Sequence, residues 1–166
     1  MIFKFLSKNF YIGFSIVILI YFLDRLTKIY VIQLDQNNFG SDIFNSSYLN
    51  IVLIWNKGIA FGLFSFNEIY LYNILSLMIL IIIITLIVMS LKSHRFKRYS
   101  LLMVVGGALG NFHDRIFYNA VPDFIDFHVG DFHWFIFNVA DIFITTGIIF
   151  MILCEIIDNN NKNEKI

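Results

Sequence analysis

The chain has 166 residues, of which 58% are hydrophobic and 14% are charged, and its mean hydropathy is +0.75. Soluble domains are about half apolar and about a quarter charged, so this composition excludes an ordinary soluble domain and indicates a surface covered by lipid. Twelve basic and twelve acidic residues cancel, which argues against nucleic acid as a partner because its recognition needs a basic face. The single cysteine, Cys154, excludes an internal disulfide.

Four apolar stretches predict four transmembrane helices, over residues 10–32, 69–91, 99–115 and 134–156. The second stretch carries no charged residue, and a helix of that length crosses about 30 Å of hydrocarbon. The other three reach full length only by taking polar residues into the membrane. The predicted fold class is therefore an all-α membrane protein, a single domain over residues 1–166, with an outer extramembrane segment in which short β-strands can form.

Lysine and arginine predict the orientation, because short cytoplasmic loops are enriched in them. Lys4 and Lys8 precede the first helix, and four basic residues lie between the second and third helices, within residues 92–98. Segments 33–68 and 116–134 together contain one lysine and no arginine. These two segments are expected to face outward and both termini to face the cytoplasm. The polar tail, residues 158–166, has the composition of a disordered end.

This orientation gathers polar residues near the outer ends of the helices. An ionisable side chain inside a span costs about 2.5 to 3.5 kcal/mol on insertion scales, so it indicates a functional residue or a buried partner. Asp24 and Lys28 lie one turn apart, which fits either an ion pair or a place in the site. A fourth helix starting near Phe132 would place Asp141 roughly 15 Å along it, below the interface. The other members of this group are Asn111, Asp114, Arg115 and Asn138.

Two local patterns predict backbone geometry. Small residues recur through the segment from Gly106 to Gly110, a spacing that lets helix backbones approach closely in lipid, so the third helix is expected to pack tightly against a neighbour. Asp123 follows Pro122, the only proline in the chain. Because proline fixes its own backbone angle, Asp123 is expected in a rigid, non-helical turn.

The outer segment also raises the question of a metal site. His128, Asp131 and His133 lie close together in sequence, and histidine and carboxylate groups are zinc ligands. Aromatic residues surround them, however, and no second group of ligands follows at a suitable spacing. We therefore predict neither a metal ion nor another cofactor.

Five sequence blocks resemble, in order and spacing, the lipoprotein signal peptidase (signal peptidase II) family. They are Asp24 to Lys28, Asn56 to Gly62, Gly106 to Arg115, Val121 to Phe124, and Phe137 to Asp141. The resemblance spans nearly the whole chain. The departures from the family pattern are local and replace no residue that the chemistry needs; they are Trp55, Ile59, His113, Asn119 and Pro122.

The resemblance implies a membrane aspartic endopeptidase that removes signal peptides from diacylglyceryl-modified bacterial prolipoproteins. It assigns catalysis to Asp123 and Asp141, of which the ionised one takes a proton from water and the protonated one donates to the scissile carbonyl. Asp114 is the rival of Asp123, but Arg115 offers it a structural partner. Supporting or substrate-binding roles are implied for Asn111, Arg115, Asn138, Asn56, Gly58, Asp24, Lys28 and Asp114.

The implied partners are the prolipoprotein substrates and membrane lipid, and the protein is expected to be a monomer. The implied location is the bacterial inner membrane, with several spans and the active site at the outer, periplasmic face. A small ion- or proton-translocating protein is the alternative, since it would also place acids in the membrane. Against it, the chain shows no internal repeat and the acids gather at one end. A purely structural membrane subunit explains the small-residue packing but leaves the polar blocks without a role.

Overall fold

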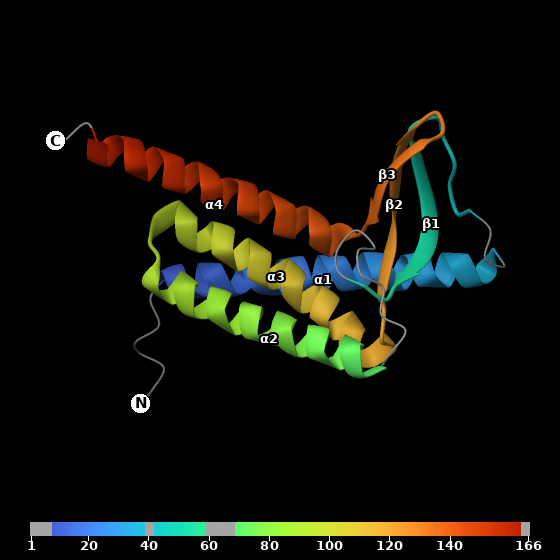
Figure 1. Cartoon of the computed structure of the whole chain (residues 1–166), viewed down its shortest axis with the longest axis horizontal. Coiled ribbons are helices and arrows are strands. Elements are labelled where there is room, and N and C mark those ends of the chain that lie inside the picture. Colours follow the sequence, from blue (N-terminus) through green and yellow to red (C-terminus); the bar gives the residue numbers. More distant parts are fainter. Residues whose placement is uncertain (1–7, 39–41, 59–68, 164–166) are drawn as a thin grey trace.

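The computed structural model describes residues 8–38, 42–58 and 69–163 and consists of four helices and a small sheet (Figure 1). The helices are α1 (Lys8–Asn37), α2 (Ile69–Lys92), α3 (Arg95–Tyr118) and α4 (Val139–Asn163). The strands are β1 (Leu49–Asn56), β2 (Val121–Val129) and β3 (Phe132–Phe137). Residues 59–62, the end of one block that carried the family resemblance, lie outside the described residues.

The four helices lie side by side, and α3 packs against each of the other three (Figure 1). Its buried side chains, such as Leu101 and Val105, form the centre of the bundle. Most large side chains of α2 point outward instead, and Leu77, Ile81 and Ile82 are each more than half exposed. A helix this apolar, with its outer face unpacked, is suited to lipid.

Within the described residues, three helices are long and apolar enough to cross a membrane, over Phe10–Asn37, Tyr70–Lys92 and Val139–Asp158. The helix α3 is not among them, although it has 24 residues. It carries basic residues in its first turn and Asn111, Asp114 and Arg115 near its end. Three of the four predicted spans are therefore supported by length and composition.

The strands form an antiparallel sheet in the order β1-β2-β3, which stands at one end of the helix bundle (Figure 1). The expectation of short β-strands in the extramembrane segment is confirmed, so the fold is mostly helical rather than all-α. The β2–β3 turn has Gly130 at φ 59°, as expected for the first central residue of a two-residue hairpin. Asn119 ends α3 in the left-handed conformation, at φ 53°, which asparagine tolerates better than most residues.

The sequence expectations about where the fourth helix begins and ends, and about how deep Asp141 lies in it, are wrong. Residues 134–137 belong to β3, so α4 begins at Val139 and not at residue 134. Asp141 consequently lies in the first turn of α4 and not deep along it. At its other end α4 continues to Asn163, so most of the tail expected to be disordered is helical.

Candidate active site

Asp123 lies near the start of β2, beside β1 and the residue that precedes α4. It is 3% exposed, and its two carboxylate oxygens accept hydrogen bonds from the side-chain amides of Asn56, at 2.9 Å, and Asn138, at 2.6 Å. The expected turn is in fact a strand: Pro122 is the second residue of β2 and pairs with Trp55. Proline fits there because β2 pairs with β3 only from Ile125 onward.

Asp141 is held by Asn138, the residue that directly precedes its own helix. Its Oδ2 accepts a hydrogen bond from the backbone N–H of Asn138, at 3.2 Å, while Asn138 Oδ1 accepts one from the Asp141 N–H, at 3.1 Å. These reciprocal bonds are those of a capping box, which satisfies two free amides at a helix start. Asn138 is fully buried and therefore contacts both carboxylates, Asp123 and Asp141, at once.

The electrostatic surroundings favour a protonated Asp123. Burial raises the pKa of its carboxyl from 3.8 to about 6, and repulsion from the Asp141 carboxylate acts in the same direction. The amides of Asn56 and Asn138 stabilise the ionised form and lower the pKa by less. A carboxyl that titrates near neutral pH beside a second carboxylate is suited to acid and base catalysis.

A buried charge cluster joins α1 to α3 beneath the two carboxylates. Lys28 Nζ contacts Asp24 Oδ2 at 2.9 Å and Asp114 Oδ2 at 2.7 Å. Arg25 contacts the same two acids, at 3.1 Å and 2.6 Å. Two cations thus neutralise two anions, as a low-dielectric interior requires. Asp24 Oδ1 also accepts a hydrogen bond from the backbone N–H of Ala140, at 3.0 Å, so the cluster holds the start of α4 as well.

One member of the cluster orients a side chain that contacts Asp141. Lys28 Nζ donates a hydrogen bond to Asn111 Oδ1 at 2.8 Å, and Asn111 Nδ2 donates to Asp141 Oδ1 at 2.8 Å. Because an ammonium group is only a donor, it fixes which end of the amide is its acceptor and turns the NH₂ group toward Asp141. Lys28 therefore acts on Asp141 through Asn111.

The expectation that Arg115 pairs with Asp114 is wrong. Asp114 pairs with Arg25 and Lys28, whereas Arg115 donates hydrogen bonds to the backbone carbonyls of Asn111 and Gly58, both at 3.1 Å. Adjacent residues on a helix point in different directions, so Arg115 cannot share the partners of Asp114. Asp114 is fully buried and its charge is balanced by these two cations, whereas the Asp123 carboxyl is repelled by that of Asp141.

Asn56 and Gly58 form a short turn after β1 that Arg115 holds against α3. The N–H of Gly58 donates to Asn56 Oδ1 at 2.8 Å, and Gly58 accepts from Arg115. This bond fixes the Asn56 amide so that its NH₂ group faces Asp123. Every residue predicted for the site is thus connected through hydrogen bonds to Asp123 or Asp141.

The small residues of α3 allow these contacts. A Cβ atom on Gly107 would lie 2.5 Å from the carbonyl oxygen of Ala140 on α4, and one on Gly110 would overlap the Asp24 carboxylate on α1. The predicted close packing of this helix against its neighbours is confirmed, and it involves two neighbours at once.

A cavity of about 390 Å³ opens beside Asp141 and is lined mainly by apolar and hydroxyl side chains. Besides Asp141, its walls include Trp134 and Phe137 of the β3 segment and Thr145 on α4. Sequence reasoning did not identify these residues. Thr145 and Thr146, two hydroxyl groups within an apolar helix, were the available signal.

Comparison with known proteins gives a consistent result. A family model described as signal peptidase (SPase) II matches residues 16–157. A lipoprotein signal peptidase of Pelagibacter ubique (strain HTCC1062) is 51% identical over 159 residues, 95% of this chain and 96% of that protein. One of Anaplasma phagocytophilum (strain HZ) is 39% identical, over 92% of this chain and 96% of that protein.

Two solved structures share the fold, and both are described as bacterial membrane enzymes. The first superposes with a TM-score of 0.73 at 29% identity and covers 90% of each chain. The second gives a TM-score of 0.68 at 31% identity, over 86% of this chain and 90% of the other. The arrangement of helices and sheet is therefore one that occurs in membrane enzymes.

Proposed function

Since the chain belongs to the signal peptidase II family, it is a protease that removes signal peptides from prolipoproteins, and we propose that Asp123 and Asp141 carry out the cleavage. We further propose that the substrate cysteine bears a diacylglyceryl group. No metal or cofactor takes part in this chemistry. Lipid and the prolipoprotein are the partners, and a single copy of the chain is the active unit.

The contacts of Asn138 carry this proposal. Its side chain donates to Asp123, and its backbone N–H donates to Asp141, so one fully buried residue fixes both carboxylates in a common position. Two buried acids that contact the same residue and repel each other share a proton more readily than they both ionise, and the apparent pKa values then belong to the pair. The pair is therefore prepared for acid and base work in a single step.

In the proposed reaction, the ionised carboxylate accepts a proton from a water molecule held between the two acids. The water oxygen attacks the scissile carbonyl carbon, and the protonated carboxyl donates its proton to the carbonyl oxygen. In the second step, the carboxyl that took the proton from water donates it to the leaving amide nitrogen as the C–N bond breaks, and a hydroxyl of the tetrahedral intermediate gives its proton to the other carboxylate, which restores the acid pair. The products are the carboxyl terminus of the signal peptide and the free amino group of the lipid-modified cysteine.

We propose that α3 is the fourth membrane span, because its 24 residues measure about 36 Å and it packs among the other three helices. Basic residues lie at the α2–α3 connection, where Lys97 pairs with Glu155 of α4. The sheet lies at the opposite end of the bundle (Figure 1), and the acid pair belongs to β2 of that sheet and to the first turn of α4. By the positive-inside rule, the termini are cytoplasmic and the site faces the periplasm from the inner membrane.

The substrate requirement is tested with two forms of one prolipoprotein, with and without the diacylglyceryl group on its cysteine. The purified chain in liposomes should cleave the modified form and leave the unmodified form largely intact. Equal cleavage of both would overturn the lipid requirement. Proton flux across the same liposomes without any cleavage would instead support the translocation alternative.

A further inference from the structure

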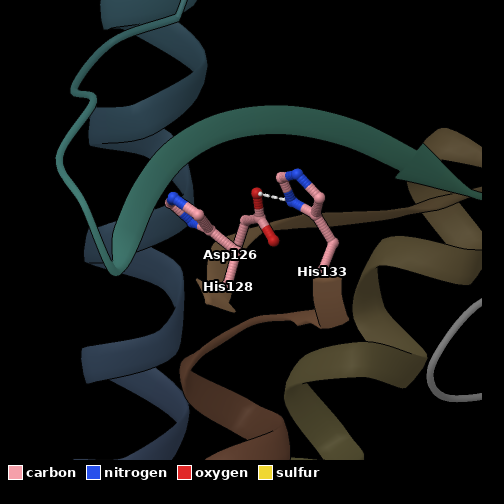
Figure 2. A group of neighbouring side chains, drawn as sticks. All are labelled: Asp126, His128 and His133. Atoms are coloured by element: carbon pink, nitrogen blue, oxygen red, sulfur yellow. Dashed lines mark hydrogen bonds and ion pairs between the residues drawn. The ribbon is translucent and has the colours of Figure 1, made fainter. Parts of the chain in front are cut away.

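A second group of chemically competent side chains lies on the sheet, outside the acid pair. Asp126 and His128 come from β2 and His133 from β3, and each offers a ligand atom within 4.8 Å of the others (Figure 2). His128 and His133 are directly opposite each other across the two strands. The site described above uses none of these three residues.

Two buried atoms of this group have no hydrogen-bond partner within the part of the chain that the structure describes. They are Oδ1 of Asp126 and Nδ1 of His128. Asp126 is 3% exposed, and an unsatisfied buried acceptor on a charged group is costly. Such atoms in a native structure call for an unseen partner. A carboxylate oxygen binds a metal, and so does an imidazole Nδ1 that carries no proton.

The arrangement around Asp126 also orients its carboxylate. His133 Nδ1 lies 2.8 Å from Asp126 Oδ2, and the Asn50 amide on β1 donates to the same oxygen at 3.3 Å. These contacts leave Oδ1 free while they fix the plane of the carboxylate. The hydrogen bond from Asn50, which is not itself one of the three residues, is of the kind that orients metal ligands in proteins.

The two imidazole rings are stacked, with centroids 5.0 Å apart and planes inclined by 19°. Rings so placed bring one nitrogen of each within reach of the same ion. Neutral imidazole is the form that binds zinc.

We propose that Asp126, His128 and His133 bind one divalent cation of the zinc class. Two imidazole nitrogens and one carboxylate oxygen suit Zn²⁺ better than Mg²⁺ or Ca²⁺, which prefer oxygen ligands. Ligand atoms about 2.0 to 2.1 Å from a tetrahedral zinc lie about 3.3 Å apart, and the ligand atoms of these three residues lie within 4.8 Å of one another, so binding requires them to move closer together. The side chain of His133 is 52% exposed, which leaves a coordination position open to water.

The bound ion would cross-link β2 to β3 and, through Asn50, hold β1 in the same sheet. Asp126 is three residues beyond Asp123 on β2, about 10 Å along the strand. The ion would therefore stabilise the sheet that presents Asp123 without touching the acid pair. This inference concerns metal binding and does not depend on the proposed proteolysis.

The test is zinc binding by the untagged, full-length protein in detergent, because a polyhistidine tag would itself bind the metal. Isothermal titration with ZnCl₂ should give one site per chain, and MgCl₂ should give none. His128→Asn and His133→Asn should each weaken zinc binding at least tenfold. The matched control is His94→Asn, an exposed histidine between α2 and α3, which should leave the affinity unchanged.

Two further readouts make the test independent of the folding of one variant. X-ray absorption should show zinc with nitrogen and oxygen neighbours at about 2.0 to 2.2 Å, and zinc should raise the unfolding temperature of the wild type but not of His133→Asn. His133 is exposed enough that its substitution should not prevent folding. Absence of a stoichiometric site, or zinc affinity that both histidine variants retain, would overturn the proposal.

Discussion

Replacing Asp123 by asparagine should make the protein more stable, relative to wild type, at high pH than at low pH. The pKa of this carboxyl is raised from 3.8 to about 6, mainly by burial. A raised pKa in an acid means that the ionised form is disfavoured in the folded state. One pH unit corresponds to 1.36 kcal/mol, so the difference between 3.8 and about 6 corresponds to about 3 kcal/mol.

The pH window follows from the sign of that difference. Below about pH 4 the carboxyl is protonated in both the folded and the unfolded states, so no penalty exists. Between about pH 4 and pH 6 the unfolded state ionises first, and the folded state loses stability as the pH rises. Above that window the penalty is complete. Asparagine cannot ionise, so Asp123→Asn escapes this penalty. Its NH₂ group replaces one of the two oxygens that accept from Asn56 and Asn138, so one of these donors loses its acceptor at every pH.

The assay is equilibrium unfolding in mixed micelles from pH 4 to pH 8, with wild type and variant measured in parallel. The difference in unfolding free energy between variant and wild type should rise by up to about 3 kcal/mol from pH 4 to pH 8. Asp131→Asn, which removes an exposed carboxylate in the β2–β3 turn, is the control and should change stability little. A difference that does not rise between pH 4 and pH 8 would refute the reasoning.

Three further predictions concern the surroundings of the acid pair. Lys28→Met leaves Asp24 and Asp114 with one cation between them and should lower the unfolding free energy by about 3 to 5 kcal/mol. The control Lys97→Met, in an exposed pair, should lower it by less than about 1 kcal/mol. Equal effects of the two substitutions would contradict the role of the buried cluster. Gly110→Ala should lower stability by about 1 to 3 kcal/mol, because its methyl group would overlap the Asp24 carboxylate, and an unchanged unfolding midpoint would be inconsistent with the packing described. Incubation with EDTA should leave the initial cleavage rate of His133→Asn, which lacks the proposed zinc site on the sheet, unchanged, and a loss in this variant that zinc restores would place a metal in the reaction.

Charge and hydropathy predicted most of the helical framework from sequence. The uncharged stretch 69–91 nearly coincides with α2 (Ile69–Lys92), and the small residues near Gly107 correctly indicated close packing of α3. These features are local, since they depend on the length of an apolar run and on the size of a side chain. The gathering of polar residues at one end of the bundle was predicted from the orientation of the helices, which the lysines and arginines indicate.

Features that depend on partners distant in sequence were predicted less well. The apolar run at residues 132–137 fits a strand as well as a helix, and its pairing with β2 decides for the strand. The ion pairs of Asp114 with Arg25 and Lys28 link residues of two different helices, which spacing along one helix does not reveal. Asp131 was the expected carboxylate beside the histidines, yet strand pairing brings Asp126 there instead.

The sequence identified Asp123 and Asp141 through a family resemblance, and the structure adds the contacts that hold them. Neither the bridging role of Asn138 nor the chain from Lys28 through Asn111 to Asp141 follows from spacing, because each requires the start of α4 to lie against β2 and α3.

The most direct test is a double-mutant cycle on cleavage of a diacylglyceryl prolipoprotein by wild type, Asp123→Asn, Asp141→Asn and the double variant. Each single substitution removes an exchangeable acid and keeps size and polarity, so each should nearly abolish cleavage while the variant still inserts and folds. Groups that act as a unit are non-additive, so the double variant should be scarcely slower than either single one. Substantial cleavage by well-folded Asp123→Asn, or two losses that multiply independently, would contradict the assignment of the acid pair.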